Sequence, residues 1–492
     1  MGGIGERFLR RGYKTYKSFL PINRTTIFEN IISNFKYIDL EVILIANFKT
    51  LDPKYRAFYK KKGFHLININ NHKFGPLYSI FLAFEKIKNI IKKNKNIFIS
   101  YSDINWSWDF KLVKNFFLKK EVVIFTHSGF HPHIEIDSKS DFCEKKNNKI
   151  NKILEKSTIS NDYKKDLLAV GCYYFKDLSY LNLFFTEDKI FKKNKEYYIV
   201  SLIQYLIKKK VNITNFNLKK FVHLGTPEQY EDFLNWENFF NKESISKKFS
   251  FKTFTSIMLM GGKGKRVSEI KTPKPLLLIE NRPIYKHIFK KLNAPEKIII
   301  ANDKFNKHID NKKFKIFHIK KTNSLFETID SSKKLLLSKS NFFLTSCDCF
   351  GIFDRKDLTK KINNKKIDII FFAFKYSNLQ KNLGTSHTQL IIKEKKLYDI
   401  EVKTKYKNSN FGHAGFFWVR KGAVFSHLLK FQSSNYFKTL SREIIIDDYF
   451  KFLINKKLII PSYVVLNHYV HIGSAKEYLE YKYWENYFKH NK

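Results

Sequence analysis

The 492-residue sequence contains two copies of one pattern. Matched residues recur at a nearly constant offset, from 245 positions for Asp103 and Asp348 to 259 positions for Gly2 and Gly261. The match reaches the end of each copy, where FVHLGTPEQYEDFLNWENFF (221–240) parallels YVHIGSAKEYLEYKYWENYF (469–488). So regular an offset indicates an internal duplication. We therefore expect two tandem domains, residues 1–245 and 252–492, which meet near the polar segment 242–252.

Each copy begins with a glycine-rich loop and an arginine. A loop of this composition turns sharply and brings bare backbone N–H groups to an anion. The arginine adds a fork of donors for phosphate oxygens, and a lysine that follows adds a mobile charge. Tight turns also use glycine for structural reasons, so the recurrence of the loop favours phosphate binding more than either copy alone. The residues are Gly2, Gly3, Gly5, Arg7 and Lys17 in the first copy, and Gly261, Gly262, Gly264, Arg266 and Lys274 in the second.

Apolar strands and amphipathic helices alternate after each loop. Alternation of this kind predicts an α/β fold with sites at the carboxyl ends of the strands. We expect each domain to be Rossmann-like, with a mostly parallel sheet flanked by helices. In the first copy the predicted strands are 41–46, 64–69 and a strand that ends at Asp103, and the predicted helices are 26–34, 53–62 and 76–92.

The first copy lacks the strand that leads into the loop. In the second copy the apolar residues Ser256–Met260 precede Gly261, whereas only Met1 precedes Gly2. A parallel sheet with this strand near its middle would lose a central strand in domain 1. Either the true start lies upstream, which we favour, or the first site is compromised.

The composition excludes few functions. The formal net charge of +46 suggests nucleic-acid binding. However, the lysines are spread along the chain, and Lys, Asn, Ile and Phe, which all have AT-rich codons, are over-used together. We therefore expect no dedicated nucleic-acid function, although a basic surface would attract anionic substrates. Four cysteines make no disulfide framework, no apolar run approaches the length of a membrane span, and no signal peptide is evident. We therefore expect a cytoplasmic protein without a membrane span.

The motifs GGKGKR and KTPKPLLLI (271–279) resemble those of the sugar-1-phosphate nucleotidyltransferases, also called nucleotide-sugar pyrophosphorylases. Their signature is GGxGxR followed by a lysine in a PKPL-like segment. The resemblance covers nearly the whole chain as two tandem copies, and it implies two GT-A-like domains. It also implies that a nucleoside triphosphate and a sugar-1-phosphate give an NDP-sugar and pyrophosphate, with Mg²⁺, for surface polysaccharide synthesis.

The resemblance assigns roles to further residues. An aspartate after a buried strand is often a helix cap, but Asp103 and Asp348 occur at the same place in both copies. In the family this aspartate binds Mg²⁺. Lys156 matches a Glu-Lys element whose lysine contacts the sugar phosphate, and Lys403 is its weaker counterpart in EVKTK. The segment that begins at Gly75 lies where the family binds the nucleobase.

One departure leaves the activity open. Many family members have W-x-D-x-G-T near the end of the domain, and its aspartate is a second Mg²⁺ ligand. Both copies here have histidine, His223 and His471, at that place. Imidazole is a poorer Mg²⁺ ligand than carboxylate, so packing or a phosphate hydrogen bond is the safer interpretation. The alternatives are a catalytically degenerate protein that binds nucleotide sugars, a chain with one active copy, and a glycosyltransferase, which would normally carry a D-x-D motif.

Overall fold

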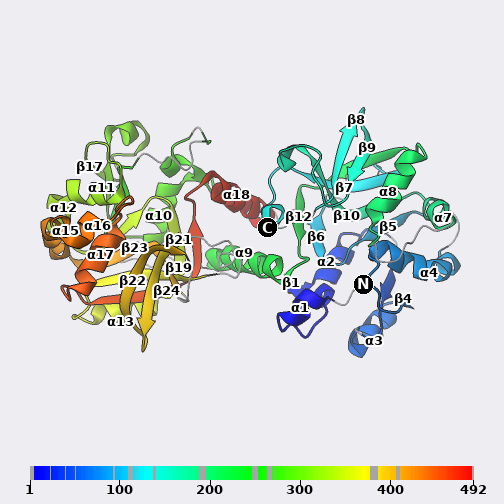
Figure 1. Cartoon of the computed structure of the whole chain (residues 1–492), viewed down its shortest axis with the longest axis horizontal. Helices are drawn as coiled ribbons and strands as arrows, with labels where there is room; N and C mark the ends of the chain where they lie inside the picture. Colours follow the sequence, from blue (N-terminus) through cyan, green and yellow to red (C-terminus); the bar gives the residue numbers. More distant parts are fainter. Residues whose placement is uncertain are drawn as a thin grey trace. The chain divides into compact units, whose positions relative to one another are not determined.

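The computed structural model divides into two compact units, Met1–Leu234 and Asn235–Lys492 (Figure 1). The division falls inside helix α9 (Pro227–Ile245). From Asn235 onward, α9 packs on helix α18 (Ala475–Lys489) of unit 2, where the rings of Trp236 and Trp484 are stacked 6.3 Å apart. The structure describes all residues except 1–4, 23, 39, 50, 92–94, 109–112, 114, 118, 137–139, 188–195, 246–252, 263–268, 271, 377–385, 406–410 and 490–492.

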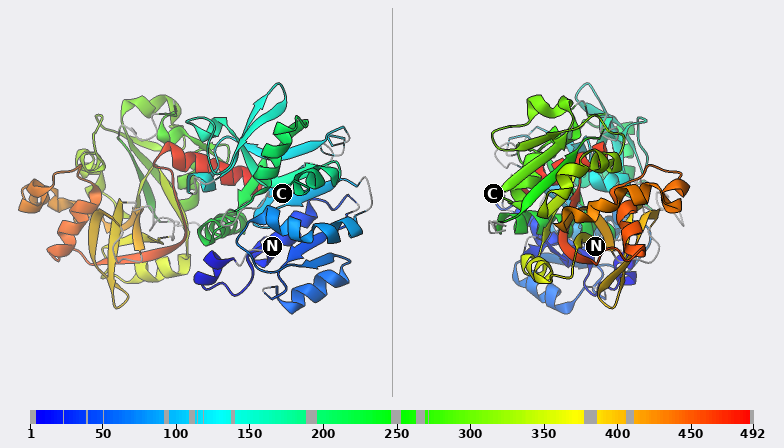
Figure 2. Two further views of the ribbon diagram at one scale, coloured as in Figure 1. Left: turned by 45° about the vertical axis from the view of Figure 1, so that its right-hand side comes forward. Right: turned by 90° about the vertical axis from the view of Figure 1, so that its left-hand side faces the viewer.

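Unit 2 contains a twisted mixed sheet (Figure 2). Its parallel part runs β17–β16–β13–β18, and β23, β20, β24 and β19 continue it, with antiparallel pairs on both sides of β23. β21 and β22 form a hairpin beside β23. The strands are β13 (Thr255–Met260), β16 (Glu296–Ala301), β17 (Lys315–His318), β18 (Ser340–Ser346), β19 (Cys349–Phe353), β20 (Ile369–Lys375), β21 (Ser386–Lys393), β22 (Lys396–Lys405), β23 (Phe411–Lys421) and β24 (Pro461–His471).

Alternate residues of the central strands of unit 2 face a core under helices. Ile257 and Leu259 of β13 pack in one apolar cluster with Ile298 and Leu344 of the neighbouring strands. A strand buried on both faces reads as a continuous apolar run, which is what TSIMLM and EKIIIA are. The helices are α10 (Ile284–Leu292), α11 (Leu325–Ser331), α12 (Lys333–Leu337), α13 (Arg355–Asn363), α15 (Leu428–Gln432), α16 (Asn435–Thr439), α17 (Ile446–Asn455) and α18.

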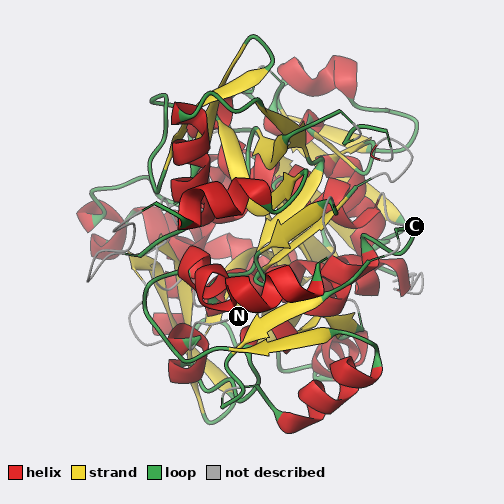
Figure 3. Ribbon diagram, turned by 90° about the vertical axis from the view of Figure 1, so that its right-hand side faces the viewer, coloured by secondary structure: helices red, strands yellow, loops and turns green. Residues whose placement is uncertain are grey.

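Unit 1 repeats this order of elements, again with helices layered on strands (Figure 3). The helices match the predicted ranges, and α2 begins with a capping box between Thr26 and Glu29. The helices are α1 (Glu6–Arg10), α2 (Ile27–Ser33), α3 (Pro53–Lys61), α4 (Pro76–Ile90), α6 (Pro132–Ile136), α7 (Ser179–Phe185), α8 (Ile199–Lys208) and α9.

The described strands of unit 1 form several separate sheets. β3 pairs with β4 in a separate parallel pair, whereas β5 lies in the sheet β5–β10–β7–β11. Among the described residues of unit 1, no strand corresponds to β13 of unit 2. The strands are β3 (Ile43–Ala46), β4 (His65–Asn68), β5 (Ile97–Ser100), β6 (Ile104–Ser107), β7 (Val122–Ser128), β8 (Phe142–Lys146), β9 (Lys149–Leu154), β10 (Leu167–Phe175), β11 (Ile213–Asn217) and β12 (Lys220–His223).

The fold class predicted from the sequence, α/β with helices flanking the sheets, is therefore observed in both units. Among the described residues, no helix is both long and apolar enough to cross a membrane.

Candidate active site

An ion pair lies at the carboxyl end of β18 in unit 2. Asp348 follows this strand, and Lys274 lies on the short helix η4 (Lys274–Leu276). Lys274 Nζ donates to Asp348 Oδ2 at 3.0 Å, and Ser346 Oγ donates to the other carboxylate oxygen at 2.7 Å. Both partners are well buried, with 9% and 15% of their side chains exposed. The signature lysine and the predicted metal ligand are therefore in direct contact.

Unit 1 contains the same pair. Lys17, on the helix η1 (Lys17–Phe19), donates to Asp103 Oδ2 at 2.6 Å. Asp103 lies between β5 and β6, at the place that Asp348 occupies between β18 and β19. The exposed fractions of the two side chains are 22% and 18%. Two residues 86 positions apart thus meet in unit 1 as their counterparts do in unit 2.

The charges around each aspartate keep it ionised. Burial by itself raises the pKa of Asp103, but the charges of Lys17 and His223 overcome this effect and lower the pKa to about 2. Burial acts in the same way on Asp348, and Lys274, His471 and the Ser346 hydroxyl hold its pKa well below the ordinary value. Both carboxylates are therefore available as anionic ligands at neutral pH.

His471 faces the aspartate of unit 2. Strand pairing of β19 with β24 sets His471 opposite Cys349, the residue after Asp348. Its Nε2 lies 3.9 Å from Asp348 Oδ2, and its Nδ1 donates to Glu477 Oε1 at 2.7 Å. Burial lowers the pKa of His471, but Glu477 and Asp348 together raise it above the ordinary value. The His471 ring therefore lies between two carboxylates, Asp348 and Glu477, that both favour its protonated form.

The glycine two positions after each histidine gives the ring its space. A Cβ on Gly473 would lie 2.3 Å from His471 Cε1, and one on Gly225 would lie 3.0 Å from His223 Cε1. In unit 1, His133 also fixes the strand end, because its Nδ1 donates to the His223 carbonyl oxygen at 2.7 Å. His133 was not predicted from the sequence, where its only signal is the histidine-rich segment HSGFHPH.

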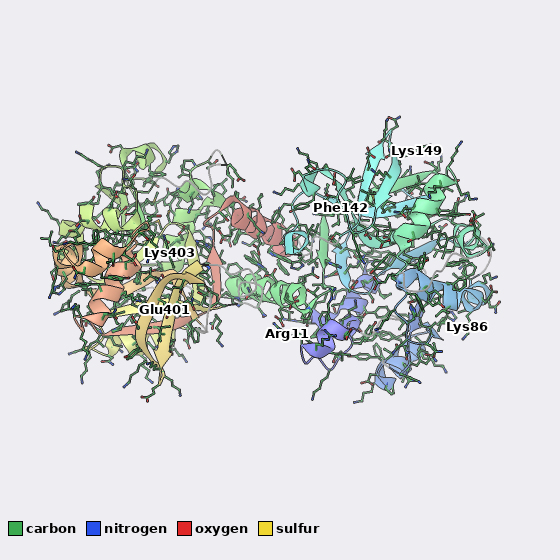
Figure 4. All side chains as sticks on the ribbon, in the orientation of Figure 1. Arg11, Lys86, Phe142, Lys149, Glu401 and Lys403 are labelled. Carbon is green, nitrogen blue, oxygen red and sulfur yellow. The ribbon has the colours of Figure 1, made fainter. Side chains whose placement is uncertain are left out.

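The predicted sugar-phosphate lysines each form a pair with a glutamate. Lys156 Nζ lies 3.3 Å from Glu196 Oε2, and Lys403 Nζ lies 3.8 Å from Glu443 Oε2. Lys403, on β22, is labelled in Figure 4. Both lysines have left-handed backbones, with φ of 51° and 50°. Neither glutamate was predicted from the sequence, although Glu196 and Glu443 differ by the same 247 positions as the two lysines.

The pair in unit 1 has two further neighbours. Tyr198 donates its hydroxyl to Glu196 Oε2 at 2.5 Å, and the Lys156 ammonium lies 4.5 Å from the centre of the Tyr198 ring. The hydrogen bond from Tyr198 is the largest influence that lowers the pKa of Glu196, and the charges of Lys156 and Arg7 act in the same direction. Arg7 is an exposed residue of α1. Arg7 and Lys156 are therefore close enough to act on the same carboxylate.

The loop glycines are described only in part. Gly5 has φ of 68° and precedes α1. Gly261 packs closely, since a Cβ there would lie 2.7 Å from the hydroxyls of Thr322 and Thr328, whereas a Cβ on Gly262 would meet nothing within 4 Å. Gly2, Gly3, Gly264 and Arg266 lie outside the described residues, so their predicted contacts with phosphate stay predictions.

Gly75 has a clear packing role. Its φ is 83°, and a Cβ there would lie 2.5 Å from the Tyr197 carbonyl oxygen. Gly75 precedes Pro76 at the start of α4, and Leu77 N donates to the same Tyr197 oxygen at 3.0 Å. These contacts place Gly75 beside the Glu196–Tyr198 segment. The close contact with Tyr197 by itself accounts for a glycine at this position. The role of Gly75 in nucleobase binding therefore stays a prediction.

The donor set fits a magnesium ion that is held mainly by substrate. The described residues contain no group of three or more His, Cys, Asp or Glu side chains arranged to hold a metal. Mg²⁺ commonly binds one or two carboxylates together with substrate phosphates and water. Asp103 or Asp348 would supply the carboxylate in each unit, and bound nucleotide would supply the phosphates.

Comparisons with known proteins found similarity to solved structures only at low sequence identity. A scan against protein-family models and a search of curated proteins found no match. Similar solved structures include a nucleoside-diphosphate-sugar pyrophosphorylase from Vibrio cholerae RC9, with 20% identity and a TM-score of 0.38, over 48% of this chain and 97% of that one. The inositol-1-phosphate CTP transferase from T. maritima has 14% identity and a TM-score of 0.38, over 49% of this chain and 98% of that one. CTP:phosphocholine cytidylyltransferase from Streptococcus pneumoniae has 19% identity and a TM-score of 0.36, over 46% of this chain and 96% of that one.

Proposed function

We propose that the chain is a nucleotidyltransferase that joins a nucleoside triphosphate to a sugar-1-phosphate and releases pyrophosphate. The observation that carries the proposal is the recurrence of one cationic constellation in both units. Each unit has a glycine-rich loop, a lysine paired with the aspartate after a central strand, and a second lysine paired with a glutamate. This set suits two phosphate groups better than it suits any acid–base reaction.

The reaction needs positioning and charge rather than a general base. An oxygen of the sugar phosphate is already an anion when it attacks the α-phosphorus, and pyrophosphate leaves on the opposite side. Loop amides and lysines can neutralise the charge that develops on the phosphoryl oxygens. Mg²⁺, when bound, would add to that neutralisation and help to align the phosphates. In unit 2, Lys274 would contact the triphosphate and Lys403 the sugar phosphate.

The ion pairs also suggest how substrate is accepted. Lys17 and Lys274 are each paired with an aspartate. A triphosphate offers each lysine a more highly charged partner, and the released aspartate can then take a metal-bound phosphate as its neighbour. The lysine would therefore move from Asp to phosphate as nucleotide enters.

The test is pyrophosphate release with Mg²⁺, measured for each nucleoside triphosphate against a panel of sugar-1-phosphates. Lys17→Ala and Lys274→Ala should each lower turnover of their own unit by about 100-fold or more. Lys14→Ala and Lys312→Ala are matched controls, because both lysines are exposed and lie outside the site. Unchanged turnover in the Lys17→Ala/Lys274→Ala double variant would refute the assignment.

The second candidate is a protein that binds nucleotide sugars without turning them over. It is favoured by one observation, the histidine that faces the aspartate in unit 2 where the family has a second carboxylate ligand. Nucleotide binding by calorimetry with no pyrophosphate release across the panel would establish it over the enzyme. The role in surface polysaccharide synthesis follows from the resemblance alone and stays a prediction.

A further inference from the structure

Three buried histidines of unit 1 have no part in the proposed reaction. They belong to the segment HSGFHPH (127–133), in which His127 ends in β7, His131 directly precedes α6, and His133 lies within α6. Their exposed fractions are 7%, 0% and 1%. Burial lowers the pKa of His127 and His131, so both of these rings are neutral at pH 7. Buried polar side chains are costly unless they have hydrogen-bond partners, so the partners of these rings indicate what the segment does.

The first two histidines contact β12 and the residue group that leads into it. His127 Nδ1 donates to the carbonyl oxygen of Leu218, two residues before β12, at 3.2 Å. The His131 ring lies 5.1 Å from the ring of Phe221, which is in the middle of β12. Both contacts are made from the segment that follows and includes the end of β7, so this segment runs along β12.

The third histidine holds the end of the same strand. His133 Nδ1 donates to the carbonyl oxygen of His223, the last residue of β12, at 2.7 Å. His133 Nε2 lies 3.1 Å from Oδ2 of Asp232, a residue of α9. An ionised Asp232 can only accept, so both ring nitrogens then donate and the ring is held on two sides. We call the three residues the histidine clamp; they are His127, His131 and His133.

The end of β12 is attached to the candidate metal ligand of unit 1. Leu224 N donates to the Asp103 carbonyl oxygen at 2.8 Å. A Cβ on Gly225 would lie 3.0 Å from His223 Nε2 and 3.5 Å from Asp103 Oδ2, so the ring and the carboxylate face the same point. The charge of His223 is also one of the causes that lower the pKa of Asp103. A shift of this strand end would therefore disturb both side chains.

Unit 2 holds the equivalent strand end in a different way. There β24 is one continuous strand that pairs with β20 and β19, whereas the corresponding residues of unit 1 are divided into β11 and β12. Glu477 of α18 accepts a hydrogen bond from the His471 ring at 2.7 Å. The residue of α9 that corresponds to Glu477 is the neutral Gln229. In unit 1 the carboxylate of the last helix is instead that of Asp232, and it acts through His133.

We propose that the histidine clamp is a positioning device of unit 1, which fixes the end of β12 and so keeps the His223 ring beside Asp103. His133 is its main positioning residue, because it joins the end of β12 to α9. The proposal rests on the proposed function in one respect, namely that Asp103 belongs to the phosphate and metal site. Hydrogen-bond partners that orient metal ligands typically change metal affinity or activity about 10–100-fold when they are removed.

The first measurement uses the full chain without substrate. NMR of a sample with labelled histidine rings reports the His223 ring, whose signal is identified by its loss in His223→Gln. In His133→Leu this signal should shift. In His133→Asn it should return toward the wild-type position, because asparagine places an amide donor near the position of Nδ1. His65→Leu is the matched control, since His65 is an exposed histidine of β4 and its loss should leave the His223 signal unchanged.

The second measurement is pyrophosphate release by unit 1, read in a Lys274→Ala background that silences unit 2. His133→Leu should lower this release about 10-fold, and His133→Asn should stay within about threefold of the parent chain. A Lys17→Ala background reads unit 2 alone, and its turnover should be the same with and without His133→Leu.

Two results would overturn the proposal. One is a His223 signal that stays in place in folded His133→Leu, and the other is an equal shift of that signal in His133→Asn and His133→Leu. If His133→Leu does not fold, His133→Gln replaces it, because glutamine keeps a donor toward Asp232 but none toward the His223 carbonyl oxygen. Absence of pyrophosphate release in every chain, wild type included, would refute the proposed function alone, because the NMR measurement would still decide the role of the clamp.

Discussion

Removal of the Lys17 ammonium should destabilise unit 1 by an amount that follows from the Asp103 pKa. The carboxyl falls from its ordinary pKa of 3.8 to about 2, with Lys17 the largest influence that lowers it. One pKa unit corresponds to about 1.4 kcal/mol, so the charged form is stabilised by about 2–3 kcal/mol in the folded state. In Lys17→Met the burial of Asp103 is no longer offset by this charge. We expect a loss of about 2 kcal/mol at pH 7.

The assay is native-state hydrogen exchange of β7 in increasing urea, which reports the opening of unit 1, with β20 of unit 2 as an internal control. Lys14→Met is the matched variant, because Lys14 is an exposed lysine of the same segment. A lowered pKa contributes stability above the unfolded value of 3.8 and loses it as the pH falls toward 2. The difference between wild type and Lys17→Met should therefore shrink below pH 4.

A double variant separates the charge from other effects of the substitution. In Lys17→Met/Asp103→Asn no buried charge is left alone, so this variant should recover much of the lost stability. The reasoning is refuted if Lys17→Met is as stable as Lys14→Met at pH 7. It is also refuted if the double variant is no more stable than Lys17→Met alone.

Three further results are expected. Glu477→Gln should lower the pKa of His471, measured by NMR titration of the ring. Because a raised histidine pKa stabilises the folded protein at pH values below that pKa, this variant should lose more stability at pH 6 than at pH 9. An unchanged titration would exclude Glu477 as the cause of the raised pKa. Gly473→Ala should cost about 1–3 kcal/mol in thermal unfolding, and Gly225→Ala less, because the added Cβ meets the histidine ring at 2.3 Å in the first and 3.0 Å in the second. Chelation with EDTA should abolish pyrophosphate release and added Mg²⁺ should restore it, so activity that persists in EDTA would contradict the metal role of the aspartates.

The repeated sequence was sufficient to predict the fold. Apolar runs such as EKIIIA and EVILIA, and the helices between them, depend on local patterning, and β16 and β3 lie within those two segments.

The site was predictable in its residues but not in its contacts. Lys274 and Asp348 are 74 positions apart, and only the folded chain brings them to 3.0 Å. Glu196 and Glu443 were missed because no local motif marks them, although the duplication offset contained the signal. Gly75 was assigned to the nucleobase, yet its contact with the Tyr197 backbone accounts for a glycine there. A sequence motif thus predicts which residues belong to the site, whereas the contacts of each residue depend on how the chain packs.

The ion pair at each aspartate has a consequence for the order in which ligands arrive. In the proposed reaction, free Mg²⁺ would compete with a lysine ammonium for the same carboxylate, because the ammonium lies 2.6 Å from it in unit 1 and 3.0 Å in unit 2. A nucleotide already complexed with Mg²⁺ would avoid that competition, since the lysine would pair with its phosphates and the aspartate would hold the metal. We therefore expect the metal–nucleotide complex to bind first and the sugar phosphate second. This binding order would appear in steady-state kinetics as an ordered sequential mechanism, in which the sugar phosphate alone does not bind the site.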